Sequence, residues 1–187
     1  MTHQTQGIIL KITDWGETSQ LFSIYTQGLG KILAVGQGTK KINSKLNSHL
    51  QPLSVTNLMI AQGKKFDKLA GAVTVKNFSG LKNDFKKIIF ANFGLELVEK
   101  LTQVQQPEER IFNLLRQYLE VLDQNKTVSR KSWFLIKRRF SLELLNLLGY
   151  QPAEPATVSD SELNNLLLNH LNQELKTAKF LEKMLLD

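Results

Sequence analysis

The chain has 187 residues, of which 42% are hydrophobic and 22% charged, with no cysteine and a net charge of +7. This composition is typical of a globular protein with a substantial core, and it excludes disulfides, thiolate-bound zinc and a cysteine nucleophile. No apolar run approaches the roughly 18 residues of a membrane span, and the polar residues 1–7 do not resemble a signal peptide.

The first 80 residues are patterned as short strands separated by turns. Side chains alternate between the two sides of the predicted strand over residues 20–26, where Phe22 and Ile24 lie on one side. Five strands are predicted, over residues 7–13, 20–26, 31–35, 53–61 and 69–75. A longer insert, residues 36–52, contains a possible short helix over 43–50. This arrangement favours a small closed barrel over alternating β-α-β units, and it predicts an OB-fold.

From about residue 80 the hydrophobic period changes from 2 to 3.6. One helix is predicted over residues 81–100, a second begins at Pro107 and ends near Asp123, and a third begins at Ser129 and ends at Gly149. Two short amphipathic helices follow residue 161. We therefore expect a multi-domain α+β chain: an OB-fold barrel over 1–79 and an α-helical bundle domain over 80–187, with a linker at 151–159.

The positive charge is concentrated in the predicted barrel. Residues 1–80 hold nine lysines and three acidic residues, a net charge of +6, whereas residues 81–187 carry only +1. Such asymmetry indicates a polyanionic partner for the first part, although a basic surface that serves solubility alone remains an alternative.

The insert is the strongest candidate for binding that partner. Its glycines, lysines and short polar side chains are the groups that a phosphate-binding loop needs, and Trp15, in a turn, could stack on bases. Residues 1–80 contain lysine but no arginine, which favours attraction to the nucleic-acid backbone over bidentate recognition of bases. The candidate DNA-binding residues are Trp15, Lys31, Thr39, Lys40, Lys41, Ser44, Lys45, Lys64 and Lys65.

Patterns that would indicate catalysis are not found. The glycine-rich stretches lack P-loop and dinucleotide-binding spacing, and the three histidines stand apart without metal-ligand spacing. No Ser/His/Asp set can be assembled either. The sequence therefore predicts a protein that is not an enzyme and has neither a metal nor a cofactor.

Several motifs occur in an order that resembles the RecO family. They are GIIL at residues 7–10, DWGE at 14–17, GTKK at 38–41, LQPL at 50–53 and the run FSLELLNLLGYQP at 140–152. The resemblance implies a bacterial, cytoplasmic, nucleoid-associated protein of the RecF pathway. Such a protein binds single- and double-stranded DNA, anneals complementary strands and helps to load recombinase. The resemblance also implies two partners, which are RecR and the C-terminal tail of single-strand binding protein.

The sequence departs from the family pattern after the last motif. Many members carry a four-cysteine zinc finger there, whereas residues 151–159 of this chain lead directly to the closing helices. We therefore expect no zinc and no zinc finger. An OB-fold protein that binds RNA or takes part in translation is the alternative interpretation.

A mixed basic and apolar surface on the helical half is a candidate site for the acidic tail peptide. Cations can bind the carboxylates of such a tail while apolar groups hold its last side chain. The candidate residues are Arg116, Arg130, Lys131, Trp133, Lys137, Arg138 and Arg139. A solvated basic helix face packed on a core of aromatics explains them equally well.

Overall fold

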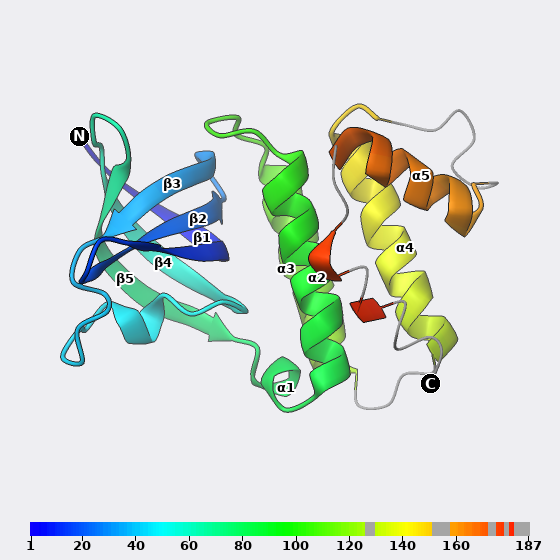
Figure 1. Ribbon diagram of the computed structural model, residues 1–187, viewed down its shortest axis with the longest axis horizontal. Coiled ribbons are helices and arrows are strands. Elements are labelled where there is room, and N and C mark those ends of the chain that lie inside the picture. The colour runs from blue at the N-terminus through cyan, green and yellow to red at the C-terminus, as the bar shows by residue number, and fades with distance from the viewer. Residues whose placement is uncertain (126–129, 151–157, 172–174, 178–179, 182–187) are drawn as a thin grey trace.

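The computed structural model describes residues 1–125, 130–150, 158–171, 175–177 and 180–181 (Figure 1). Its first part is a closed barrel with the strand order β1-β2-β3-β5-β4. The strands are β1 (Thr2–Trp15), β2 (Ser19–Thr26), β3 (Gly30–Gly36), β4 (Ser54–Ala61) and β5 (Asp67–Asn77). The predicted α+β class and OB-fold barrel are confirmed. β1 begins five residues before its predicted start, and the other strand ends lie within two residues of the prediction.

Alternating side chains fill the inside of the barrel. Strand residues such as Ile9, Phe22 and Ile24 are fully buried there, and Leu50 from the insert closes the interior. The insert forms only a 3₁₀ turn, η1 (Asn47–His49), instead of the predicted helix over 43–50. Asn and Ser side chains compete for backbone groups in this segment; the Ser48 hydroxyl, for example, donates to the Lys45 carbonyl at 3.3 Å.

Five helices are described after the barrel: α1 (Ser79–Lys82), α2 (Phe85–Leu101), α3 (Glu109–Gln124), α4 (Arg130–Leu147) and α5 (Asp160–Leu171). The predicted helix over 81–100 is divided into α1 and α2 because the Asp84 carboxylate accepts hydrogen bonds from the first amides of α2. Gly149, with φ of 80°, ends α4 as expected. The predicted cap Ser129 and most of the linker lie outside the described residues.

The helices and the barrel share one hydrophobic core. Ile8, Leu10 and Tyr25 point out of the barrel and pack with residues of α2, α3 and α4 in a single cluster. Figure 1 shows α2 and α3 standing beside the end of the barrel where β2 turns into β3. The core thus crosses the predicted domain boundary, and the division at residue 79 stays a prediction.

A buried lysine holds the two parts together. The Lys31 side chain is only 8% exposed, and its ammonium group donates to the Glu99 carbonyl at 2.6 Å and to the Thr102 carbonyl. Burial lowers the pKa of Lys31, and the nearby Glu99 carboxylate partly opposes that change. The ammonium thus caps the C-terminal end of α2, where free carbonyls favour a cation.

Two further residues join the barrel to the helices. We call the contacts of Tyr25, Gly30 and Lys31 with the end of α2 and the α2–α3 connection the seam. The Tyr25 hydroxyl donates to the Glu108 carbonyl at 3.1 Å, and burial followed by the Glu108 charge raises the pKa of Tyr25 to about 12. Gly30 has a φ of 66°, and a Cβ atom there would lie 2.2 Å from the Gln106 carbonyl oxygen. Only glycine allows this close approach of β3 to the α2–α3 connection.

The end of the described chain is attached to α2 by a carboxylate. Glu96 accepts hydrogen bonds from the Lys176 amide at 2.9 Å and from the Thr177 amide and hydroxyl at 3.0 and 2.7 Å. Burial raises the pKa of Glu96, but these hydrogen bonds outweigh it and leave the pKa below its ordinary value.

We predict that Lys31→Met lowers the free energy of unfolding by about 1–3 kcal/mol, because the α2 carbonyls lose a charged donor. Urea unfolding of the full chain measures this change. Lys11→Met, at an exposed lysine on β1, is the matched control and should change stability by no more than about 0.5 kcal/mol. Equal stabilities of the two variants would contradict the role assigned to Lys31.

Candidate nucleic-acid interface

Three loops lie on the side of the barrel that faces away from the helices (Figure 1). They are the β1–β2 turn, the β3–β4 insert and the β4–β5 loop. The Lys40 amide donates to the Thr18 carbonyl at 3.0 Å, which joins the insert to the turn. The rings of Trp15 and Phe66, 5.1 Å apart between centroids, join the turn to the β4–β5 loop. The tertiary structure thus gathers loops that are far apart in the sequence.

Five lysines project from two of these loops, and we call them the basic rim: Lys40, Lys41, Lys45, Lys64 and Lys65. All five are exposed. Lys40 pairs with the Asp14 carboxylate at 3.0 Å, and the other four form no ion pair within the described part of the chain. The rim therefore presents cations that are free to attract a polyanion.

Two polar residues of the insert shape the loop and are not equally accessible. Thr39 is fully buried and its hydroxyl donates to the Gly36 carbonyl at 3.0 Å, so it supports the loop and cannot reach a phosphate. Ser44 is half-buried, and its amide donates to the Lys41 carbonyl at 3.0 Å. Thr39 is therefore buried away from any DNA, contrary to its predicted role as a contact residue.

Lys31 was also predicted to contact DNA, and the structure places it elsewhere. It lies in the seam, where its ammonium group is bound to α2 carbonyls. A side chain buried in this way cannot track a phosphate backbone. The sequence did not distinguish it from the rim lysines because nothing local to β3 indicates that α2 covers it.

The basic residues predicted on the helical half do not form one pocket. Trp133 is buried in the core, with its ring stacked on Phe90 at 5.0 Å between centroids. Arg138 binds Asp160 at 2.9 Å and also the Val158 carbonyl, so it positions the start of α5. Both were predicted to bind a peptide, and their contacts assign them to the fold instead.

The other members of this set differ in exposure. Arg116 is half-buried near Glu120, 3.7 Å away, and Lys137 lies over the Phe93 ring at 4.8 Å. Lys131 and Arg139 are exposed on α4. The side chain of Arg130 lies outside the described residues.

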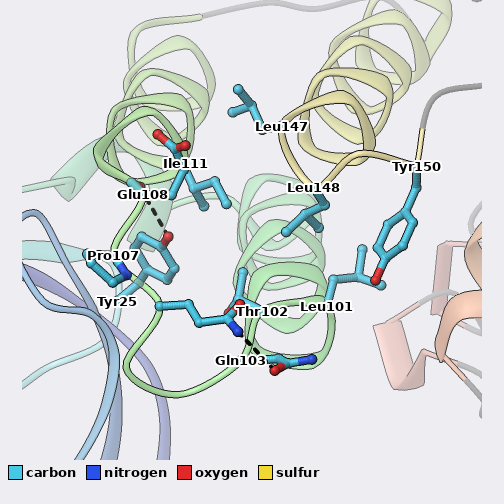
Figure 2. A pocket seen from close by; sticks show the side chains of 11 residues that line it. Tyr25, Leu101, Thr102, Gln103, Pro107, Glu108, Ile111, Leu147, Leu148 and Tyr150 are labelled. Atoms are coloured by element: carbon cyan, nitrogen blue, oxygen red, sulfur yellow. Dashed lines mark hydrogen bonds between the residues drawn. The ribbon is translucent and has the colours of Figure 1, made fainter.

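A cleft of about 240 Å³ lies in the seam, between the α2–α3 connection and the end of α4 (Figure 2). None of the predicted site residues lines it. Its charged lining group is the Glu108 carboxylate, and hydrogen bonds from Arg110 hold the pKa of Glu108 at about 2. Arg110 neutralises this carboxylate through two side-chain hydrogen bonds, and no described lysine or arginine lines the cleft, so the cleft does not suit DNA or an acidic peptide. It escaped prediction because its lining residues come from several separate elements: Tyr25, Leu101, Thr102, Gln103, Gln106, Pro107, Glu108, Ile111, Leu147, Leu148 and Tyr150.

Within the described residues, no group of three or more His, Cys, Asp or Glu side chains could hold a metal ion. The described helices also include none that is long and apolar enough to cross a membrane.

Two family models match successive parts of the chain. The model described as "Recombination protein O N terminal" matches residues 1–78, and the one described as "Recombination protein O C terminal" matches residues 82–159. The chain belongs to the RecO family. The break between the two matches falls at α1, where the strands end and the helices begin.

Proteins named "DNA repair protein RecO" are among the relatives of this RecO-family chain. The protein of Alkaliphilus metalliredigens is 30% identical over 85% of this chain and 63% of its own length. That of Gloeothece citriformis is 35% identical over 67% of this chain and 44% of its own length. That of Caldanaerobacter subterraneus is 25% identical over 98% of this chain and 76% of its own length. The chain therefore matches less than two thirds of the length of the first two relatives.

We predict that Asp14→Asn raises the affinity of the chain for a polyanion, because the substitution frees Lys40 from its ion pair. The variant should elute from a heparin column at a higher salt concentration than the unchanged chain. Glu17→Gln removes the same charge from the same turn but breaks no ion pair, and it should shift elution less. An equal shift for both variants would show that only net charge matters.

Proposed function

We propose that this RecO-family chain is a DNA repair and recombination protein that binds DNA through the basic rim and acts without catalysis. The observation that carries this proposal is that two loops on the side of the barrel away from the helices expose five lysines, four of which have no carboxylate partner among the described residues. Membership of the RecO family supports it. We place its activity in the bacterial cytoplasm, at the nucleoid.

The chemistry of the rim suits binding that does not depend on base sequence. Lysine ammonium groups are point charges that attract phosphates, and they lack the planar fork with which arginine reads guanine. Both single and double strands offer phosphates to such groups. By neutralising two strands at once, the rim lowers the repulsion between them, which is the physical basis of strand annealing.

The helical half supplies a separate surface for protein partners. Lys131, Leu135 and Arg139 follow one another at four-residue spacing on α4 and therefore share one face of the helix. Lys131 and Arg139 are exposed, and Leu135 is 56% exposed. An acidic peptide with an apolar last residue needs this combination, so we propose that the face binds the C-terminal tail of single-strand binding protein. RecR is the second partner that we propose, and together these contacts would help recombinase to load on coated DNA.

Reversing two rim charges tests the DNA site. We expect Lys41→Glu with Lys45→Glu to weaken binding to single-stranded DNA more than 10-fold at low salt. The slope of log affinity against log salt should become less negative by about 1.4, which is about 0.7 for each lost phosphate contact. Fluorescence anisotropy at several salt concentrations measures both quantities.

The matched control is Lys82→Glu with Lys86→Glu, which reverses two exposed lysines on α1 and α2. It should leave the slope unchanged, whereas equal losses in the two double variants would assign binding to overall charge. A clear preference for structured RNA in competition would argue against a role in DNA repair.

Annealing on DNA coated with single-strand binding protein tests the mediator role. The unchanged chain should anneal coated strands faster when the coating protein keeps its C-terminal tail. Lys131→Glu with Arg139→Glu should remove that advantage while annealing of naked strands stays the same. If annealing is insensitive to the tail in the unchanged chain, the proposed tail site is wrong.

A further inference from the structure

The outer face of the first three strands carries an apolar strip next to the basic rim. Leu21, Leu33 and Val35 lie on this face, because their strand neighbours Phe22, Ile32 and Ala34 point into the barrel core. Leu21 pairs with Val35 across the ladder, which places them side by side. All three are only half-buried. The strip is therefore an apolar surface on the outside of the barrel that solvent can reach.

Lysines flank the strip on both sides. Lys68 of β5 pairs with Val35, and Lys11 of β1 pairs with Ser23, which itself pairs with Leu33. Both lysines are exposed. The strip thus has a cation at each edge, which is the arrangement that a strand with an anionic backbone and apolar base faces requires.

Trp15 stands at one end of the strip. It lies on the same side of β1 as Lys11 and Thr13, because outward positions alternate along a strand. Its ring meets the Phe66 ring edge-on, at 83° between planes, and remains 42% exposed. The Lys65 ammonium group lies 5.6 Å from the centre of the Phe66 ring.

Contacts on two sides hold the turn that carries Trp15. Gly16, with φ of 71°, turns the chain directly after it, and Asp14 before it is tied to Lys40. The turn is thus held on one side by the insert and on the other by Phe66. The indole is therefore an accessible aromatic platform that Phe66 supports at one edge.

We propose that Trp15 and the strip bind the unstacked bases of a single strand, while Lys11, Lys65 and Lys68 bind its phosphates. The inference rests on the proposed DNA binding and adds selectivity to it. The basic rim attracts single and double strands alike, whereas only a single strand can offer base faces to an aromatic ring. Base stacking on Trp15 therefore favours single-stranded over duplex DNA.

Three probes separate the contribution of base stacking from that of charge. The first is an oligothymidine of about 16 nucleotides, which is the upper site size of one OB-fold. The second is an abasic strand with the same number of phosphates, and the third is a duplex of that length. The unchanged chain should bind oligothymidine about 5- to 100-fold more tightly than the abasic strand, as expected for one stacked base. Trp15→Ala should abolish most of this difference and leave duplex affinity unchanged. Trp15→Phe should retain most of it.

Phe85→Ala is the matched control, because Phe85 is 69% exposed on α2, outside the strip. It should leave all three affinities unchanged. Binding of oligothymidine should also quench tryptophan fluorescence, and Trp15→Phe should remove the quenching because Trp133 is buried.

Equal affinity of the unchanged chain for oligothymidine and the abasic strand would overturn the stacking site while leaving the proposed DNA binding intact. An equal loss for all three probes in Trp15→Ala would also overturn it. Failure of the chain to bind any of the probes would instead refute the proposed function itself.

Discussion

The arrangement of the molecule depends on one strand that pairs with two neighbours. The first half of β1 pairs with β4, from Thr2 to Ile8, and its second half pairs with β2, as far as Trp15. A register shift between Ile9 and Lys11 lets the strand bend from one partner to the other. This bend closes the barrel, and it carries the β1–β2 turn to the place where the insert and the β4–β5 loop meet it. The basic rim and the aromatic platform both follow from that closure.

The opposite end of the barrel is committed to the helices. There Tyr25, Gly30 and Lys31 bind the α2–α3 connection, and the ammonium of Lys31 caps α2. Lys31 therefore joins the barrel to the helices, whereas the lysines of the basic rim are exposed to solvent. Because the helices occupy one end of the barrel, the proposed DNA surface and the proposed partner surface on α4 lie on separate parts of the molecule. Binding at one need not displace a ligand at the other.

Four residues that were predicted to bind a ligand have a structural role instead, for related reasons. Lys31, Thr39, Trp133 and Arg138 all carry groups that suit binding, but contacts within the fold occupy each of them, and for all except Thr39 the partner is distant in sequence. Thr39 differs in that its partner, Gly36, is close by, but its burial still depends on the closed barrel. Residue type and local pattern describe what a side chain can do, whereas burial decides what it is free to do.

The sequence by itself determined the strand and helix order, the OB-fold class, the location of the charge and membership of the RecO family. It could do so because periodicity, turn residues and short motifs are local properties of the chain. Only the tertiary structure decided that Trp15 meets Phe66, that Lys31 binds the end of α2 and that a cleft lies between the barrel and the helices. These features join residues separated by dozens of positions, and their energies arise from burial and from contacts that exist only once the barrel has closed and the helices have packed against it.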